Sequence, residues 1–471
     1  MNIKDDFVLK DIHEGWLVGG SVRDFLMGKT SPDRDIAIFG AKKFADKIAE
    51  EWKGTLVVLD NENQIFRVVL PDKINYLDIS EIEGNSIEED LKRRDFTINA
   101  IAYDLKNNKF IDVTGGQENL KNRTLRHIKD SNFEDDPLRL LRAFRFAAVT
   151  GFDMSEDLKS AINKYKHLLL NPSKERITYE LMKLFGGKYT AKTLLMMDEF
   201  GILEKLFPCV NEMKSVPPNT HHHLDLLHHV IETVRQIEEL YENSAPEEKA
   251  HLDKVDFGGF PRINHLKLAG FLHDIGKYST WTIEGGKFDG MKGTECDLSK
   301  LEEGVRQRFI KHDDVGAKMC VPMLKELKFS KKQIDYISFM IKFHIYPSNV
   351  VAAPDLSEKV MMRYIRKTGD NVIDNIILAK ADRLSARGEA ITEEMVRDNL
   401  QGLDKLLNFY MSKKDSLKPL PKLIDGFEVM QIKNIKQSPK LGEIMNALKE
   451  AQINGDIVTK DEAVEFVKKY E

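Results

Sequence analysis

Two acidic side chains near the start of the chain, Asp33 and Asp35, are spaced so that they could bind one metal ion together. They stand in the stretch from Trp16 to Gly40, which reads WLVGGSVRDFLMGKTSPDRDIAIFG. Residues i and i+2 of a strand share a face, so these carboxylates would project together and repel each other unless a cation lies between them. Mg²⁺ held by carboxylates and nucleotide phosphates is the usual arrangement.

A glycine pair just before these aspartates is suited to holding phosphates. Gly19 and Gly20 follow a short apolar run and precede a predicted helix. That helix covers Val22–Met27, with Ser21 as its N-cap. A glycine turn that opens a helix leaves backbone N–H groups and a positive dipole end facing an anion, and Arg23 would add a second contact. Together with the aspartates, the turn favours nucleotidyl transfer over a plain turn followed by solvated carboxylates.

GGSVRD followed by DRD resembles the head domain of the tRNA nucleotidyltransferase and poly(A) polymerase family, in its bacterial-type class (class II). The resemblance implies an α+β fold, in which a head with a mixed or antiparallel sheet and helices precedes an all-helical neck, an HD domain and a tail. A predicted strand at Tyr76–Ile79 carries Asp78. Beside the aspartate strand in an antiparallel sheet, Asp78 would be a third carboxylate that acts as base or metal support for the attacking hydroxyl. The alternative is an ordinary edge-strand aspartate.

The string RRDFTINA, which begins at Arg93, matches the second motif of this family closely. The resemblance implies that Arg93 or Arg94 contacts the triphosphate or the ribose, and that Asp95 and Asn99 orient the sugar. The interval between Asp78 and this motif is short. Family members that add all three terminal nucleotides usually carry a longer loop here, and members that add only the two cytidines tend to lack it. Addition of two cytidines is therefore favoured, and full CCA addition stays open.

Three arginines, Arg139, Arg142 and Arg145, recur at every third residue of a predicted helix. Asp136 and the proline after it suit the cap and first turn of this helix. The segment resembles the nucleotide-selecting motif EDxxR of the family, with Asp135 in place of the usual glutamate. Because an aspartate and an arginine at this spacing can pair with the edge of cytosine or adenine, we expect Asp136 and Arg139 to select the incoming base. Arg142 would read the base with them and Arg145 would assist, unless the arginines form only a solvated face.

A second set of candidate ligands lies between residues 205 and 395. Imidazoles and carboxylates on separate predicted helices can face inward and hold a metal. The string HDIGK, with a histidine upstream and an aspartate downstream, resembles an HD phosphohydrolase domain. The resemblance implies a transition metal (Mn, Ni, Co or Fe) whose bound water attacks a phosphoester. The implied ligands are His229, His273, Asp274 and Asp382 for one ion, and His312 and His344 for a second.

Two alternatives apply to this region. Domains of this kind are often retained as RNA-binding scaffolds, so a scaffold without hydrolase activity is as good an interpretation as an enzyme. The run His221–His223 is too closely spaced to belong to the same ligand set, and we expect it at the surface.

Length and composition bound the remaining possibilities. The chain has 471 residues with 71 Lys+Arg against 76 Asp+Glu, so its charge of -5 does not itself indicate nucleic-acid binding, and an RNA surface must come from local clusters. Three widely spaced cysteines, a charged N-terminus and the lack of a long apolar run predict a cytoplasmic protein without a membrane span. The expected domains are a head (1–125), a neck with the nucleotide-selecting helix (126–205), an HD domain (206–395) and a tRNA-binding tail (396–471).

These motifs predict a Mg²⁺-dependent enzyme that transfers CMP, and in an open alternative also AMP, from CTP or ATP to the 3′ end of a tRNA. Its basic tail would contact the RNA backbone. The rival interpretations are a poly(A) polymerase with the same head chemistry, an HD phosphohydrolase or cyclic phosphodiesterase that uses the head to bind RNA, and a non-catalytic RNA-binding protein. The sequence leaves open which nucleotides are added, which metal the HD site holds and the oligomeric state.

Overall fold

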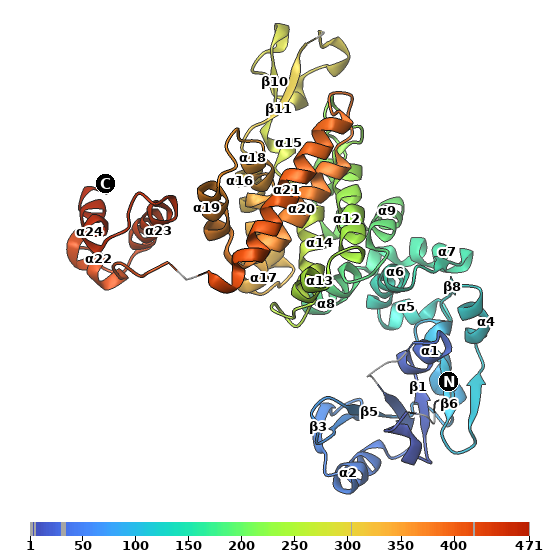
Figure 1. The fold of residues 1–471 in the computed structure, drawn as a ribbon. Helices are drawn as coiled ribbons and strands as arrows, with labels where there is room; N and C mark the ends of the chain where they lie inside the picture. The colour runs from blue at the N-terminus through green and yellow to red at the C-terminus, as the bar shows by residue number, and fades with distance from the viewer. Residues whose placement is uncertain (1–2, 4–5, 30–33, 303, 418–419, 471) are drawn as a thin grey trace. The chain divides into compact units, whose positions relative to one another are not determined.

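The computed structural model of the protein describes residues 3, 6–29, 34–302, 304–417 and 420–470. The chain divides into two compact units, Met1–Phe207 and Pro208–Glu471. The first unit combines a sheet with helices, and the second is largely helical (Figure 1). The predicted α+β fold, with a sheet-containing head followed by helical segments, is therefore confirmed.

A seven-stranded mixed sheet forms the centre of the first unit. Its strands are β1 (Trp16–Val18), β2 (Asp35–Ile38), β3 (Thr55–Asp60), β4 (Ile65–Val69), β5 (Tyr76–Glu81), β6 (Ile101–Asp104) and β7 (Lys109–Asp112). Their order across the sheet is β3-β4-β5-β2-β1-β6-β7. All neighbouring pairs are antiparallel except β2 and β5, which run parallel.

The parallel pair corrects one expectation. The strand of Asp78 was predicted to lie antiparallel to the strand of Asp35, and this orientation is wrong. Between β2 and β5 the chain passes through helix α2 (Ala41–Glu51) and the β3–β4 hairpin, and this crossover returns the chain in the direction of β2. The two aspartates are nevertheless direct register partners.

The two faces of this sheet have different chemistry. One face packs against α2 through a buried apolar cluster that includes Ile36 and Ile79. Side chains alternate between the faces along each strand, so Asp35, Asp78 and Arg67 project to the opposite face. The sheet thus buries one side and presents a row of charged groups on the other.

Helix α1 (Gly20–Leu26) begins earlier than predicted, because Gly19 adopts a positive φ of 70° and serves as its N-cap. Ser21 was expected to cap this helix, and this is wrong: its hydroxyl accepts a hydrogen bond from the backbone N–H of Asp35 at 3.2 Å. Gly28, just past the end of the helix, has a positive φ of 72°. Ser21 therefore ties the glycine turn to the strand that carries the carboxylate.

The remaining elements of the first unit are mostly helical. Helix α6 carries the three arginines and packs against α8 and α9. The elements are α3 (Ile87–Lys92), α4 (Gly116–Lys121), α5 (Ser131–Asp135), α6 (Leu138–Thr150), α7 (Glu156–Tyr165), α8 (Lys174–Phe185), α9 (Thr190–Glu199) and α10 (Leu203–Leu206), with short strands β8 (Thr124–Leu125) and β9 (Asp153–Met154).

The second unit is a helical bundle with a hairpin, β10 (Trp281–Glu284) and β11 (Arg306–Phe309) (Figure 1). Its helices are α11 (Val210–Met213), α12 (Leu226–Glu242), α13 (Pro246–Leu252), α14 (Arg262–Leu272), α15 (Lys277–Thr280), α16 (His312–Glu326), α17 (Lys331–Phe343), α18 (Tyr346–Val351), α19 (Glu358–Thr368), α20 (Val372–Ser385) and α21 (Glu393–Lys413). Helix α12 packs on α14 and α20, and α17 packs on α14 and α16.

A buried carboxylate, Asp374, holds four of these helices together. It accepts hydrogen bonds from Tyr336 at 2.6 Å, from His251 at 2.7 Å and from Arg262 at 3.0 Å. Burial alone would raise the pKa of Asp374, but the hydrogen bond from His251 and the charge of Arg262 lower it to about 2. The carboxylate is therefore ionised and fixes α13, α14, α17 and α20 against one another.

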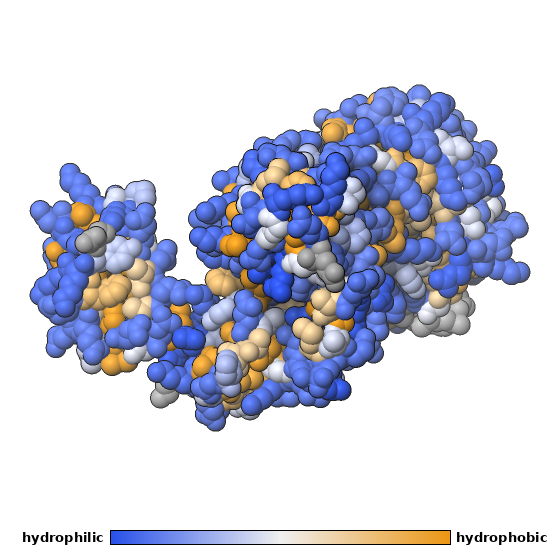
Figure 2. Space-filling model, turned by 90° about the horizontal axis from the view of Figure 1, so that it is seen from above, coloured by the Kyte–Doolittle hydropathy of each residue, from blue (hydrophilic) through white to orange (hydrophobic). Residues whose placement is uncertain are grey.

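The C-terminal helices α22 (Gly426–Lys433), α23 (Pro439–Asn454) and α24 (Lys460–Lys469) enclose a small core of their own that includes Val429, Leu448 and Val467. The face of the molecule in Figure 2 is mostly hydrophilic, with small hydrophobic patches between polar side chains. Among the helices that the structure describes, none is both long and apolar enough to cross a membrane.

Candidate active site and metal centre

A cavity of about 700 Å³ in the first unit gathers most of the predicted head residues. Those that line it are Gly20, Arg23, Asp35, Asp78, Arg94, Asp136, Arg139, Arg142 and Arg145. Arg93 does not line this cavity, because its side chain is exposed and pairs with Glu83. Asp33, the first aspartate of the predicted pair, lies outside the described residues.

The carboxylates of Asp35 and Asp78 lie side by side on neighbouring strands, which are about 4.8 Å apart in a sheet. Both residues are half-buried. A Cβ atom added to Gly19 would lie 3.3 Å from Asp35 Oδ2 and 3.4 Å from Arg94 Nη1. Only glycine combines this positive φ with so close an approach, so the turn brings bare backbone next to the carboxylate.

A chain of hydrogen bonds positions Arg23 at the cavity. Its Nη1 atom donates to Asn99 Oδ1 at 2.8 Å, and the Asn99 amide donates to Asp95 Oδ1 at 3.0 Å. Arg23 also pairs with Asp24 at 2.8 Å, and its guanidinium lies 5.4 Å from the centre of the Phe146 ring. The glycine turn and the RRDFTINA motif are thereby linked through one arginine.

In the cavity wall, Arg142 and Arg145 of α6 pair with two buried carboxylates. Arg142 donates to Asp95 Oδ2 at 2.9 Å and lies 3.5 Å from Glu180 Oε1, while Arg145 Nε lies 3.0 Å from Glu180 Oε2. Burial alone would raise the pKa of Asp95, but the charge of Arg142 and the hydrogen bond from Asn99 lower it to about 2. Burial lowers the pKa of Arg145 to about 10 despite the charge of Glu180. These two arginines therefore do not belong to a solvated face.

The pair predicted to select the base, Asp136 and Arg139, lies at the start of α6. Asp136 Oδ1 accepts from the backbone N–H of Leu138 at 3.2 Å, as expected for a residue that caps this helix. Its other oxygen accepts from Arg176 of α8 at 2.8 Å. Arg139 donates to the backbone oxygen of Asn132 at 3.0 Å. Both side chains line the cavity and are held by neighbours rather than by each other.

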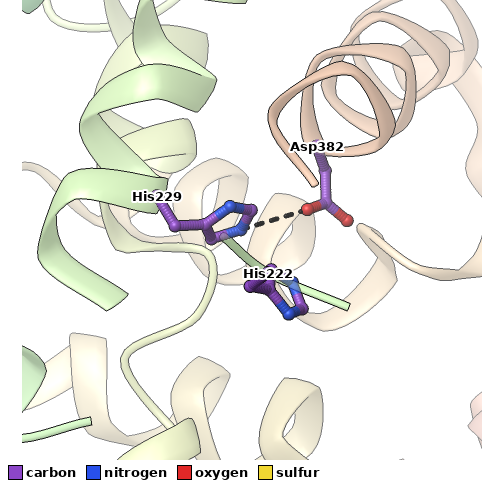
Figure 3. A group of neighbouring side chains, drawn as sticks. All are labelled: His222, His229 and Asp382. Carbon is purple, nitrogen blue, oxygen red and sulfur yellow. Dashed lines mark ion pairs between the residues drawn. The ribbon is translucent and has the colours of Figure 1, made fainter. Parts of the chain in front are cut away.

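In the second unit, all six predicted HD ligands come together. His229 Nε2 lies 3.2 Å from Asp382 Oδ1, an ion pair drawn in Figure 3. Asp274 is the centre of the cluster: its Oδ2 atom lies 3.2 Å from His273 Nε2, and its Oδ1 atom lies 3.2 Å from His312 Nε2. His344 Nε2 lies 3.5 Å from the same Oδ1 atom. Of the adjacent histidines at 228 and 229, the buried His229 faces the cluster, as the family match implied, while His228 is exposed.

His222 corrects the expectation that the run His221–His223 lies at the surface. His221 and His223 are exposed, but His222 joins His229 and Asp382 in a group whose ligand atoms lie within 4.8 Å of one another (Figure 3). A tight turn explains the difference, because the backbones of Asn219 and His222 exchange two hydrogen bonds of 2.9 and 3.1 Å. The turn directs the His222 ring onto the His229 ring, with 4.6 Å between their centres.

The chain matches three family descriptions in succession. They are the Poly A polymerase head domain at residues 15–126, the probable RNA and SrmB-binding site of polymerase A at residues 151–214, and the HD domain at residues 226–387. The chain belongs to the tRNA nucleotidyltransferase and poly(A) polymerase family. It is a nucleotidyltransferase of the CCA-adding type with an HD domain.

Relatives of this nucleotidyltransferase differ in the nucleotides that their names specify. The CC-adding tRNA nucleotidyltransferase of Thermus thermophilus is 28% identical over 98% of this chain and 95% of the relative. The A-adding tRNA nucleotidyltransferase of Deinococcus radiodurans is also 28% identical, over 96% of this chain and 95% of the relative. The complex of a CCA-adding enzyme with CTP superposes with a TM-score of 0.55 over 99% of this chain and 95% of that chain at 20% identity, which shows a shared fold.

Both candidate metal positions have donor atoms suited to a cation. A nucleotidyltransferase head implies a divalent metal, and the paired oxygens of Asp35 and Asp78 are the hard ligands that Mg²⁺ prefers. In the HD cluster, His273 donates through Nδ1 to the backbone oxygen of Gly270 at 2.7 Å, and His344 does the same to Ile341. These contacts turn each Nε2 atom toward the cluster, which is how metal-binding histidines are oriented.

The electrostatics of the HD cluster agree with a cation site. Among the described residues, the buried Nε2 atoms of His229 and His273 make no well-formed hydrogen bond. Burial alone would raise the pKa of Asp274, but the charges of His273 and Lys277 hold it well below its usual range. Lys277 Nζ lies 2.6 Å from Asp274 Oδ2. An ionised carboxylate among inward-facing imidazoles fits the donor set of a transition metal.

Sequence reasoning missed Arg67 and Arg176 as well as His222. Arg176 is in a segment that was assigned only as a neck helix, and its contact with Asp136 joins α8 to α6. Arg67 is in a strand that carried no motif, and it binds both oxygens of Asp78. The Arg176 contact depends on how two separate helices pack, and the Arg67 contact depends on the register of the neighbouring strands β4 and β5. Neither follows from a motif in the sequence.

Proposed function

We propose that this nucleotidyltransferase adds CMP from CTP to the 3′ end of a tRNA without a template, with Mg²⁺ as the head metal and release of pyrophosphate. The observation that carries this proposal is the register pairing of Asp35 and Asp78 beside the glycine turn. Addition of AMP from ATP is the open extension, because the CC-adding and A-adding relatives are equally identical to this chain. In this proposal residues 1–125 are the head, 126–205 the neck, 206–395 the HD domain and 396–471 a tail that binds tRNA.

In the proposed reaction the 3′-hydroxyl oxygen of the tRNA attacks the α-phosphorus of CTP. A new P–O bond forms there, and the bond between the α-phosphorus and the pyrophosphate oxygen breaks. Gly20 and Arg23 hold the triphosphate, and Arg94 supports the sugar and phosphate. Mg²⁺ held by Asp35 and Asp78, with Asp33, would neutralise the phosphate charge. Catalysis of this kind depends on positioning and charge neutralisation.

Base selection is assigned to the start of α6. Asp136 accepts a hydrogen bond from the exocyclic amine of the base and Arg139 donates to its ring acceptor, a pattern that uracil and guanine do not match. The anchors on Arg176 and Asn132 support this assignment, because they hold both side chains in place before a nucleotide binds. Arg142 reads the base with this pair, and Arg145 assists by sharing the Glu180 carboxylate.

We expect labelled CMP to enter tRNAs that end before the first and before the second cytidine, and no nucleotide to enter a tRNA that already ends in both. The assay offers each labelled nucleoside triphosphate separately to the three tRNA ends. Label from ATP entering the third substrate would extend the activity to full CCA addition. Long A tails on unrelated RNAs would identify a poly(A) polymerase, and no incorporation at all would refute the proposal.

The HD cluster favours a second candidate function, hydrolysis of a phosphoester with a transition metal. His229 and His273 supply Nε2 atoms that contact the carboxylates within the cluster, and Asp274 and Asp382 supply charge. These groups lie at a cavity of about 340 Å³ that Asp274, Asp382 and His312 line. A metal-bound water is the nucleophile that such a site would provide.

His273→Ala is expected to abolish the opening of a 2′,3′-cyclic nucleotide to its nucleoside monophosphate, while CMP incorporation stays within twofold. Mn²⁺, Ni²⁺ or Co²⁺ should stabilise the wild-type second unit by about 2.7 kcal/mol at a hundredfold excess over its Kd, and the variant by much less. The measurements are the nucleoside monophosphate formed and thermal melting with and without a chelator. His228→Ala, which changes an exposed neighbour, is the control. Equal metal stabilisation of His273→Ala would remove the metal assignment.

A further inference from the structure

Three charged side chains and the glycine turn lie in one row across the head sheet. Arg67 on β4 is the register partner of Asp78 on β5, and Asp78 is in turn the partner of Asp35 on β2. Asp35 is the partner of Val18 at the end of β1, directly before Gly19. Register partners project to the same face at about 5 Å from one another. The row therefore runs from the guanidinium through two carboxylates to the glycine turn.

Arg67 binds the middle member of this row with both ends of its guanidinium. Its Nε atom donates to Asp78 Oδ1 and its Nη2 atom to Asp78 Oδ2, each at 2.7 Å. The guanidinium lies 4.0 Å from the centre of the Tyr76 ring, which holds its plane in place. Arg67 occupies a lone pair on each oxygen of Asp78 and neutralises its charge, so the pair weakens the binding of a cation shared with Asp35 until it rearranges.

The chemistry of nucleotidyl transfer fixes the side from which the RNA must arrive. In an in-line displacement the attacking and leaving oxygens lie on opposite sides of the phosphorus. The triphosphate site at Gly20 and Arg23 lies on the β1 side of Asp35, so the leaving pyrophosphate is there. The attacking 3′-hydroxyl then approaches from the other side, where Asp78 and Arg67 stand.

We propose that Arg67 is a positioning residue that binds the terminal phosphodiester of the incoming RNA and, in doing so, releases Asp78 to the head metal. The inference rests on the proposed nucleotidyl transfer. In the free protein Asp78 is the bidentate partner of Arg67, and in the complex a phosphate takes that place with the same fork geometry. Every charge stays paired during the exchange, and the full negative charge of Asp78 becomes available to the metal when RNA is present.

The test is equilibrium binding of a fluorescent tRNA that lacks its 3′-terminal CCA, measured over a salt series with Mg²⁺ but without nucleotide. Arg67→Gln is expected to weaken binding about five- to tenfold and to reduce the salt slope by about 1, because one phosphate contact is lost. In turnover, KM for tRNA should rise by a similar factor while KM for CTP stays within twofold. The Mg²⁺ concentration that gives half-maximal rate should fall at least threefold, since the guanidinium no longer competes for Asp78.

Two further variants complete the design. Arg235→Gln removes another bidentate arginine, which pairs with Glu232 at 2.7 and 2.8 Å on α12, and should change none of these values. Arg67→Lys keeps the positive charge but cannot bridge both oxygens of Asp78. It should therefore keep the wild-type salt slope, lose the part of the tRNA affinity that the fork supplies, and still show the lower Mg²⁺ midpoint. This variant tests the inference if Arg67→Gln folds poorly.

The outcomes separate this inference from the proposed function. If Arg67→Gln keeps wild-type tRNA affinity, salt slope and Mg²⁺ midpoint, Arg67 is a structural partner of Asp78 and the inference is refuted. If the wild-type protein incorporates no nucleotide, the proposed function itself fails.

Discussion

Asp35→Asn is expected to lower the rate of CMP incorporation by at least about 10³-fold without unfolding the protein, because one charged ligand of the Mg²⁺ that neutralises the reacting phosphate is lost. Asp35 lies between the glycine turn and Asp78, so its carboxylate is the group closest to both the phosphates and the second acid. Asparagine preserves the size of the side chain but supplies no negative charge. The measurement is the initial rate of label transfer to tRNA at saturating Mg²⁺, with a melting curve of each variant.

Asp46→Asn is the matched control for this experiment. Asp46 is an exposed aspartate on α2, the helix that covers the opposite face of the sheet, and pairs there with Lys42. We expect the wild-type rate from this variant. An Asp35→Asn enzyme that retained a tenth or more of the wild-type rate would contradict the proposed mechanism.

Arg142→Met is expected to destabilise the first unit by about 3–5 kcal/mol, the cost of leaving buried charges without their partner. The side chains of Asp95 and Glu180 are only 6% and 3% exposed. Arg142 neutralises Asp95 and shares the neutralisation of Glu180 with Arg145. Urea unfolding followed by fluorescence measures the loss, since Trp16 and Trp52 belong to the first unit.

Two comparisons test the physical reason for this loss. Arg126→Met removes an exposed arginine that pairs with Asp157 at 2.8 Å, and should cost less than about 1 kcal/mol. Adding Asp95→Asn and Glu180→Gln to Arg142→Met should restore part of the stability, because the stranded charges are then gone. A loss below about 1 kcal/mol for Arg142→Met alone would show that water neutralises the two carboxylates.

The pH dependence of the same equilibrium follows from Asp95. Its pKa is lowered from 3.8 to about 2 in the folded protein, chiefly by Arg142 and Asn99 against the effect of burial. The stabilisation is therefore fully present above pH 3.8 and is lost as the pH falls toward 2. Wild type should show this acid-dependent loss, and Arg142→Met should lack most of it.

Local patterns in the sequence were enough for the parts of the molecule whose geometry is set over a few residues. The glycine turn, the strand of Asp35 and the helix that carries Arg139 each occur where their spacing predicted. The six HD ligands also meet as implied, because each follows from its place in an ordered family motif.

Features that depend on distant segments could not be found in this way. The parallel pairing of β2 and β5 depends on a crossover through α2. The Ser21 hydroxyl, predicted to cap a helix, instead accepts a hydrogen bond from the backbone N–H of Asp35. His222 joins the metal cluster only because a turn folds back on Asn219. A run of three adjacent histidines contains no signal that one of them alone faces inward.

The parallel alignment of Asp35 and Asp78 lowers the stability of the folded head. Like charges that face each other across neighbouring strands oppose sheet formation, and Arg67 offsets only part of that repulsion. The strands that bring them together are joined by a long crossover, so this contact is non-local in the sequence. The pair of acids therefore serves catalysis and lowers the thermal stability of the head. Selection for thermal stability alone would favour loss of one acid.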